Sequence, residues 1–253
     1  MARFKVGVHL RPQQTTMQAL RGAWKEADKL GVDVITTWDH FFPRGGDPDG
    51  PHFECWSMLA AMACDTSQAR IGSLATCVHY RNPNLLADMA RTVDHISGGR
   101  LNLGLGAGNT ERDFQEYGYE YGTAASRLKK LEEALPVIKG RLAKLNPPPL
   151  GPLPILIGGG GEKVTLRLVA QYADMWNAPA PPDEYARKND VLNEWCARLG
   201  RGAAEIERSV NVPANAVDKA GEWLEAGAQL LLVQMDQPFD MKPVERILQL
   251  AGK

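Results

Sequence analysis

The stretch that decides the fold is residues 70–109, which read RIGSLATCVHYRNPNLLADMARTVDHISGGRLNLGLGAGN. Its apolar run Ile71–Val78 predicts a strand that ends in the polar loop Tyr80–Pro83. A helix is predicted next, because apolar residues recur at steps of three and four: Leu85, Leu86, Met89, Ala90, Val93 and Ile96. Ser97–Gly99 ends that helix, since glycine adopts the left-handed conformation of a C-terminal cap. Leu101–Leu105 then predicts a strand parallel to the first, joined to it by a right-handed crossover.

The same strand–helix unit repeats along the whole chain. Strands are predicted at Phe4–Leu10, Val32–Trp38, Ile71–Val78, Leu101–Leu105, Ile155–Ile157, Met175–Asn177, Ile206–Val212 and Gln229–Gln234. Helices are predicted at about Thr16–Leu30, Phe53–Cys64, Leu85–Ile96, Ser126–Ala143, Lys163–Tyr172, Asp183–Leu199, Ala214–Ala226 and Pro243–Leu250, with a shorter one at Glu111–Tyr117.

Strict alternation of this kind predicts an α/β protein, a (β/α)8 TIM barrel that spans residues 1–253 as a single domain. An open doubly wound sheet is the alternative, and a GxGxxG motif after the first strand would favour it, but that motif is absent. The proline-rich segment Asn146–Pro154 is too rigid to be helical, and it is interpreted as a connection inside the barrel.

Composition narrows the class of partner. Lys and Arg number 29 against 30 for Asp and Glu, so the net charge of −1 gives no electrostatic reason to expect nucleic acid or an anionic membrane. No apolar run reaches the roughly 20 residues that span a bilayer. The four cysteines lack CxxC spacing and indicate reduced thiols. The first residues already begin a strand, and we expect a cytoplasmic protein.

In a barrel, function lies at the C-terminal ends of the strands. Six places are selected by this rule: His9, Asp39–His40, Thr76 with His79, Gly106–Glu111, Gly158–Gly161 and Trp176–Asn177. A histidine with an ordinary pKa of roughly 6.5 can move protons near neutral pH, so His40 is a candidate acid or base. The alternative is that Asp39 caps the next turn and His40 is a packed loop residue. The histidines show no metal-ligand spacing, and no metal is expected.

The two glycine runs have two interpretations each. Gly158–Gly161 lies where a strand turns into a helix, so its N–H groups can point at an anion. It lacks the Gly-Lys-Ser/Thr ending of a P-loop, and the alternative is a tight turn that needs glycine for its dihedral angles alone. Gly106–Asn109 allows close approach of a planar ligand, or forms a turn. Since neither GxSxG nor a cysteine beside a base is present, a cofactor is expected to carry the chemistry.

Longer segments resemble a known family across nearly the whole chain. They are Trp38–Phe41, Gly72–Pro83, Ser97–Gly108 and Ile155–Gly161 followed by Ala173–Asn177. Together they resemble the luciferase-like monooxygenase superfamily, specifically its branch that uses the deazaflavin coenzyme F420. The resemblance implies a bacterial luciferase-like (β/α)8 barrel with the coenzyme at its C-terminal mouth, and a homodimer.

The resemblance also implies roles for individual residues. His40 would be the acid or base beside the deazaflavin, a non-proline cis peptide at Ser73–Leu74 would back the ring, Thr76 would face it, and Gly158–Gly161 would hold the coenzyme phosphate. Sugar-phosphate dehydrogenases of the family carry a glutamate after the glycines, where this chain has Asn109, with Glu111 two residues further on. The implied catalytic residues are His40 and Glu111. The implied cofactor-binding residues are Asp39, Ser73, Leu74, Thr76, Gly106, Ala107, Gly108, Asn109, Gly158, Gly159, Gly160 and Gly161.

The activity expected from the resemblance is hydride transfer between C5 of F420 and a small organic substrate. Two alternatives stay open: a monooxygenase that uses reduced FMN, and a barrel that binds F420 without catalysing a reaction. The family's usual long insertion before the strand at Ile155 is reduced here to Asn146–Pro154.

Overall fold

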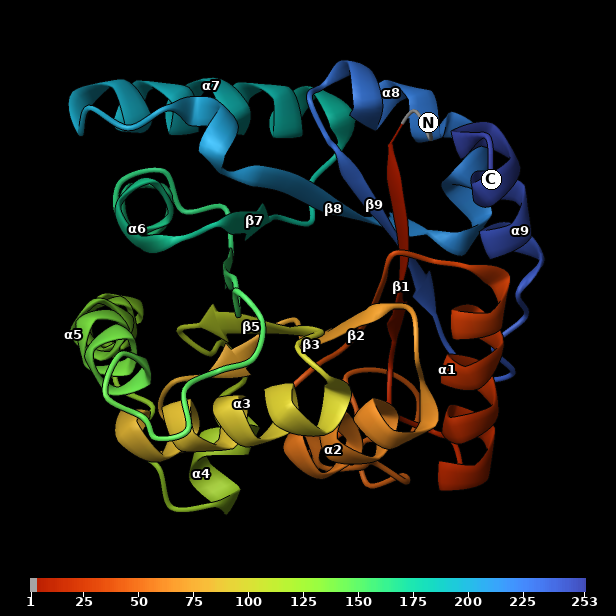
Figure 1. The fold of residues 1–253 in the computed structure, drawn as a ribbon, viewed down its shortest axis with the longest axis horizontal. Helices are drawn as coiled ribbons and strands as arrows, with labels where there is room; N and C mark the ends of the chain where they lie inside the picture. The colour runs from red at the N-terminus through yellow and green to blue at the C-terminus, as the bar shows by residue number, and fades with distance from the viewer. Residues whose placement is uncertain (1–3) are drawn as a thin grey trace.

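The computed structural model describes residues 4–253, and these form a closed barrel of parallel strands (Figure 1). The strands are β1 (Lys5–Leu10), β2 (Val34–Thr37), β3 (Arg70–Ser73), β4 (Thr76–Cys77), β5 (Leu101–Gly106), β6 (Ile155–Gly158), β7 (Met175–Asn177), β8 (Glu207–Pro213) and β9 (Leu230–Met235). They lie in the order β3-β2-β1-β9-β8-β7-β6-β5-β4, and β3 also pairs with β5, which closes the sheet.

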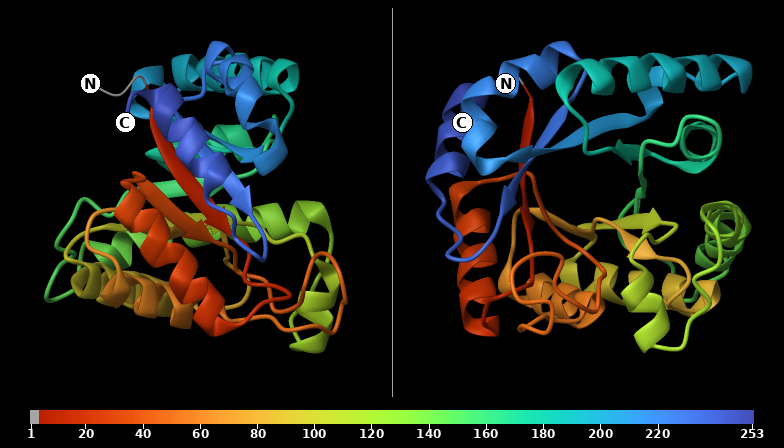
Figure 2. Two further views of the ribbon diagram at one scale, coloured as in Figure 1. Left: turned by 90° about the vertical axis from the view of Figure 1, so that its right-hand side faces the viewer. Right: turned by 180° about the vertical axis from the view of Figure 1, so that it is seen from behind.

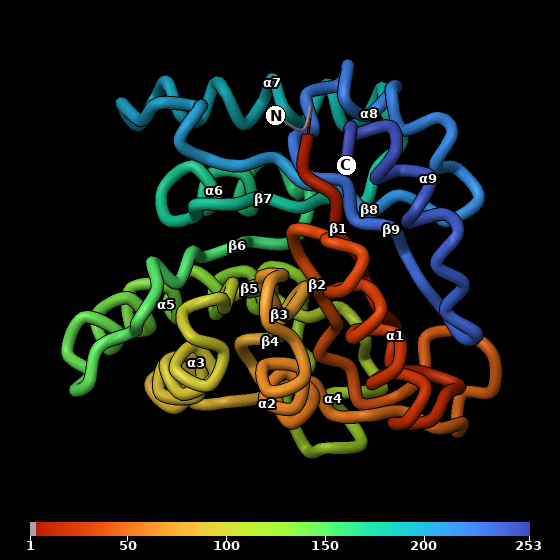
Figure 3. Tube along the Cα trace, turned by 45° about the vertical axis from the view of Figure 1, so that its right-hand side comes forward, coloured from red at the N-terminus to blue at the C-terminus, as the bar shows by residue number. Residues whose placement is uncertain are grey.

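Both β3 and β4 pair with β5, so together they fill one position in a barrel of eight (Figure 3). The predicted (β/α)8 barrel is therefore confirmed. The predicted strand Ile71–Val78 is divided into β3 and β4 by Leu74 and Ala75, which are joined by a cis peptide bond.

The position of that cis bond corrects the expectation of Ser73–Leu74 by one residue. Ser73 still pairs with Thr37 of β2, and the N–H of Leu74 donates to the Thr37 carbonyl at 2.7 Å. The regular ladder therefore continues through the N–H of Leu74, and the chain departs from it only after that residue.

The helices surround the barrel (Figures 1 and 2). They are α1 (Met17–Leu30), α2 (Cys55–Asp65), α3 (Pro83–Ser97), α4 (Glu111–Glu116), α5 (Ala124–Leu142), α6 (Thr165–Tyr172), α7 (Pro182–Arg198), α8 (Ala220–Glu225) and α9 (Lys242–Ala251), with short 3₁₀ turns η1 (Ala203–Glu205) and η2 (Ala214–Lys219). The single helix predicted at Ala214–Ala226 is thus a 3₁₀ turn followed by α8, an arrangement common at helix N-termini. Within residues 4–253 no helix is long and apolar enough to cross a membrane.

The predicted apolar face of α3 is wrong at its two ends. Leu86, Ala90 and Val93 are buried, but Leu85 is 55% exposed and Ile96 is 45% exposed. Adjacent residues on a helix are rotated by about 100°, so only the row that contains Leu86, Ala90 and Val93 faces the barrel. The predicted end of the helix is confirmed, because Gly98 has a positive φ of 70° and its N–H bonds back to the last turn.

Gly104 shows how closely the strands approach each other below the mouth. A Cβ atom placed on this residue of β5 would lie 1.9 Å from the carbonyl oxygen of Ser73 in β3. No side chain fits there, so glycine at this position allows β3 and β5 to meet where β4 has not yet begun.

Candidate active site

The C-terminal ends of the strands surround a cavity of about 630 Å³. Nine of the residues predicted for the site line it: Asp39, His40, Leu74, Gly106, Ala107, Gly108, Asn109, Gly158 and Gly159. Five do not line it: Ser73, Thr76, Glu111, Gly160 and Gly161. Most of the residues that were selected for their place at the strand ends therefore line one cavity.

His40 follows the end of β2 and is held by a carboxylate from α4. Its Nδ1 lies 2.6 Å from Oδ2 of Asp113, whose side chain is completely buried. The other oxygen of Asp113 accepts the backbone N–H groups of Phe41 at 3.0 Å and Phe42 at 3.3 Å. Burial alone would raise the pKa of Asp113, but the hydrogen bond and charge of His40 and the two N–H groups hold it below its ordinary value.

The ionised Asp113 fixes how His40 is oriented. A carboxylate can only accept at Nδ1, so Nδ1 carries a proton and Nε2 is directed away from Asp113. Nε2 lies 3.4 Å from Nη1 of Arg44, which also donates to the side chains of Asn109 and Thr110, each at 2.9 Å. His40 and Arg44 thus meet at the cavity, where Nε2 can give or take a proton.

Asp39, next in sequence to His40, is hydrogen-bonded by protein groups on both of its oxygens. Arg81 donates to both of its oxygens, at 2.6 and 2.9 Å, and the N–H of Cys77 donates at 3.0 Å. Burial raises the pKa of Asp39, and Arg81 opposes that effect. With both oxygens bound by protein groups, the carboxylate ties the segment after β4 to the end of β2, and so holds the backbone beside His40.

Ser73 and Thr76 support the floor of the cavity from below. The hydroxyl of Thr76 donates to Ser73 Oγ at 2.7 Å, and Ser73 donates to the carbonyl of Gly104 at 2.9 Å. Leu74 and Ala75, between them in sequence, line the cavity themselves. The expectation that Thr76 faces a bound ring is not met by this geometry, because Thr76 is fully buried.

Two glycines keep the space beside this floor open. A Cβ placed on Gly106 or on Gly158 would lie 3.4 Å from Cβ of Ala75, in ordinary contact, so either added methyl group would fill cavity space. Gly108 has φ +75°, and a Cβ there would come within 2.6 Å of Cys77 Sγ. The walls next to Ala75 are therefore made of backbone, which suits a flat ligand that approaches closely.

The second half of the glycine run turns away from the cavity. Gly159 donates its N–H to the carbonyl of Asn177 at 2.8 Å, and Lys188 donates to the carbonyl of Gly160 at 2.8 Å. The N–H groups of Gly160 and Gly161 have no acceptor among residues 4–253. They precede α6 and remain available to an anion just beyond the cavity.

Glu111 does not join the other predicted residues. It is exposed at the start of α4, where its carboxylate accepts from Gln115 at 2.8 Å. The carboxylate that reaches His40 is Asp113, two residues further on, which sequence reasoning missed. The one signal for it in the sequence is its place beside the apolar Phe114, which is fully buried in this short helix, as Asp113 is.

The wall that continues around the barrel from Gly158 carries uncharged polar side chains from four adjacent strands. They are Asn177 of β7, Asn211 of β8, Gln234 of β9 and His9 of β1. Asn177 donates to Asn211 Oδ1 at 3.2 Å, and Gln234 pairs with His9 in the sheet register. This wall offers hydrogen bonds without a net charge.

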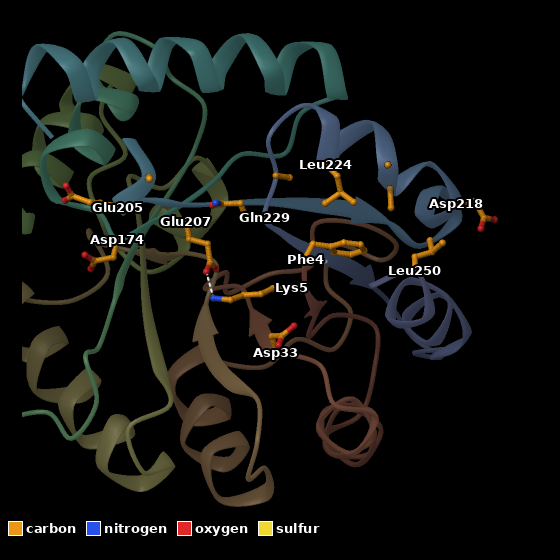
Figure 4. Close-up of a pocket in the computed structure, with 14 residues that line it drawn as sticks. Phe4, Lys5, Asp33, Asp174, Glu205, Glu207, Asp218, Leu224, Gln229 and Leu250 are labelled. Carbon is orange, nitrogen blue, oxygen red and sulfur yellow. Dashed lines mark hydrogen bonds and ion pairs between the residues drawn. The ribbon is translucent and has the colours of Figure 1, made fainter. Parts of the chain in front are cut away.

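A larger hollow of about 1000 Å³ lies at the opposite end of the barrel (Figure 4). It is lined by residues at the starts of strands, such as Lys5, Glu207 and Gln229, and by apolar side chains such as Phe4 and Leu224. Lys5 and Glu207 form an ion pair there. None of the predicted site residues lines it.

Comparison with known proteins gives consistent relatives. The family described as luciferase-like monooxygenase matches residues 1–249. A 5,10-methylenetetrahydromethanopterin reductase from Archaeoglobus fulgidus is 29% identical over 226 residues, which cover 82% of this chain and 63% of the reductase. An F420-dependent glucose-6-phosphate dehydrogenase from Amycolatopsis mediterranei is 28% identical over 187 residues, which cover 67% of this chain and 54% of that enzyme. The chain thus matches less than two thirds of the length of either protein.

Solved structures agree on the fold. An F420-dependent secondary alcohol dehydrogenase, in complex with an F420-acetone adduct, superposes with a TM-score of 0.85 at 16% identity and covers 98% of each chain. The oxygenating constituent of 3,6-diketocamphane monooxygenase from Pseudomonas putida, in complex with FMN, superposes with a TM-score of 0.76 at 15% identity, covering 100% of this chain and 98% of the other.

Proposed function

The chain belongs to the luciferase-like monooxygenase family, and from that premise we propose that it is an F420-dependent oxidoreductase. It would move a hydride between C5 of the deazaflavin and a small organic substrate. The observation that carries the proposal is the His40–Asp113 pair at the edge of a cavity in which one wall, beside Ala75, is glycine backbone. The relatives whose names include F420 support the choice of coenzyme.

The residues around the cavity fit a flat ring with a charged tail. Leu74, Ala75, Gly106 and Gly158 would contact the ring, because they present an apolar floor and no side chains on the flanking glycines. The N–H groups of Gly160 and Gly161 would receive the phosphate, since they have no acceptor within the described part of the chain. The bound coenzyme would supply or accept the hydride.

A residue of the chain would transfer the accompanying proton. When a carbonyl or imine carbon gains a hydride, the adjacent oxygen or nitrogen gains negative charge, and the imidazolium form of His40 would neutralise it with the proton on Nε2, which leaves the ring neutral with its proton on Nδ1. In the opposite direction Nε2 would accept that proton. Asp113 would stabilise the imidazolium form and keep the ring aimed at the cavity.

Titration of the purified protein with F420 and with FMN, followed by fluorescence quenching, tests the coenzyme. We expect F420 to bind in the micromolar range and FMN to bind at least tenfold more weakly. Micromolar binding of FMN without binding of F420 would contradict the proposal and favour the reduced-FMN monooxygenase. Binding of F420 without oxidation of its reduced form by any of a panel of ketones, enones, imines and quinones would favour a barrel that only binds the coenzyme.

A further inference from the structure

His9 is a second histidine of the same cavity, and the proton-transfer step does not use it. It lies in β1, is 3% exposed and lines the wall of uncharged side chains. Its Nδ1 lies 3.0 Å from Thr36 Oγ1, and that hydroxyl lies 3.2 Å from the carbonyl oxygen of Val8. Because the single proton of Thr36 goes to Val8, its oxygen accepts from His9, which assigns the ring proton to Nδ1.

The other ring nitrogen of His9 has no partner in the part of the chain that the structure describes. Burial, and then the positive charges of Arg11 and His40, lowers the pKa of His9 to about 3. Arg11 is paired with Asp236 and His40 with Asp113, and among residues 4–253 no carboxylate forms an ion pair with His9. The ring is therefore neutral near pH 7, with a lone pair on Nε2.

We propose that His9 is a fixed hydrogen-bond acceptor whose Nε2 receives an N–H or O–H donor of the bound ligand. The inference rests on the proposed function only for the identity of the ligand. It adds a chemical requirement: the group that meets this wall carries an uncharged donor. Two groups of the proposed reaction have such a donor, namely the imide N–H of the deazaflavin ring and the hydroxyl of an alcohol substrate.

Charged groups fit this position poorly. A carboxylate or phosphate would place its lone pairs against that of Nε2, and the nearby charge of Arg11 is already paired with Asp236. A cationic donor would lie near Arg11 and His40. The wall therefore selects neutral groups, whereas anions are better received at Gly160 and Gly161.

The tautomer can be tested on the protein without any ligand. In a long-range ¹H–¹⁵N NMR spectrum, with the signal of His9 assigned from its absence in a His9→Gln variant, we expect the Nδ1–H form and no titration between pH 5 and 8. A Thr36→Val variant removes the acceptor for Nδ1–H and should shift the ring toward the Nε2–H form. An Nε2–H tautomer in the wild type, or titration in that range, would overturn the proposal.

Binding measurements then identify the donor. His9→Leu removes the acceptor, whereas His9→Gln can keep one, so His9→Leu should weaken binding by about three- to tenfold relative to His9→Gln. A higher Kd for F420 points to the coenzyme ring, and a higher KM with an unchanged Kd points to the substrate. Equal values for both variants and the wild type would refute the acceptor role.

The two proposals fail in different ways. If the wild type binds only FMN, the F420 proposal is wrong, and the same variants are measured with FMN, which also carries an imide N–H. If His9→Leu does not fold, Thr36→Val replaces it, because it should turn a donor toward the ligand and weaken binding as well. Unchanged binding in Thr36→Val despite a shifted tautomer would overturn the role of His9.

Discussion

The two ends of the barrel each carry a hollow, and the larger one is at the end that none of the predicted site residues lines. At the N-terminal end about 1000 Å³ is bordered by Lys5 and Glu207, an ion pair in which the lysine side chain is 56% exposed. At the C-terminal end about 630 Å³ is bordered by His40 and by Asp39, whose fully buried side chain pairs with Arg81. The hydrogen bonding of the polar atoms around a hollow is therefore a better indicator of a functional site than its volume is.

The difference has a physical reason. An exposed ion pair is screened by water and contributes little to stability, and it leaves its side chains free to move. A buried carboxylate needs partners for its oxygens, and those partners fix its position. The buried polar groups at the C-terminal end are held in fixed geometry, which is what a site that positions reacting atoms requires.

The largest expected effect is on turnover at the C-terminal end. His40→Gln should lower kcat by about 10²- to 10⁴-fold, the usual contribution of a positioned acid or base, while the Kd for F420 changes little. Steady-state oxidation of reduced F420 and fluorescence titration measure the two quantities. His79→Gln is the matched control, since His79 does not line the cavity, and it should keep wild-type turnover. Wild-type kcat in His40→Gln would remove His40 from the mechanism.

The next largest effect is on folding, at the buried ion pair. Arg81→Leu leaves Asp39 without its main partner, so the free energy of unfolding should fall by about 3–5 kcal/mol. Urea unfolding followed by circular dichroism measures it. The control is Arg187→Leu, which breaks an exposed pair with Glu162 and should cost under about 1 kcal/mol. Equal losses in the two variants would erase the distinction between buried and exposed pairs.

A smaller effect is expected from pH. The pKa of Asp113 is lowered in the folded protein, so its stabilising contribution is complete above the ordinary value of 3.8 and is lost as pH falls through the lower folded value. Between pH 5 and 2 the wild type should lose more stability than Asp113→Asn, which has no proton to gain there. Parallel curves of unfolding free energy against pH for the two proteins would contradict the ionised Asp113.

The smallest effect is expected at the N-terminal end. Lys5→Met breaks the pair with Glu207 at the edge of the larger hollow, and it should change the unfolding free energy by under about 1 kcal/mol. Turnover and coenzyme affinity should match the wild type. A loss of turnover beyond twofold would show that the two ends are coupled and that the comparison between them is too simple.

Much of this arrangement was predictable because it depends on local sequence signals. Strand ends, glycine caps and the glycine runs are visible in short windows, so the cavity, His40, Gly106 and Gly158 could be named in advance. The residues that hold the site residues in place could not be named in advance. Asp113 is 73 residues from His40 and Arg81 is 42 from Asp39, and no local pattern reports contacts of such separation.

The errors also have physical causes. Thr76 was expected to face a ring, but Trp56 from α2 and Ser73 enclose it in a buried chain of hydrogen bonds. Glu111 was chosen by its offset from the glycines, yet the turn of α4 brings Asp113 inward and leaves Glu111 in solvent. Which residue of a helix points inward depends on how the whole helix docks, and a six-residue helix gives too little periodicity to show it.

The contact between Asp113 and the backbone of residues 41–42 has a consequence for how the proposed substrate site could diversify. The carboxylate that orients His40 also anchors the start of the loop beside the mouth, and it does so through main-chain N–H groups. Any amino acid except proline offers that N–H group. Directed evolution could therefore vary the side chains at positions 41 and 42 to admit substrates of new shape, and the orientation of His40 would be preserved.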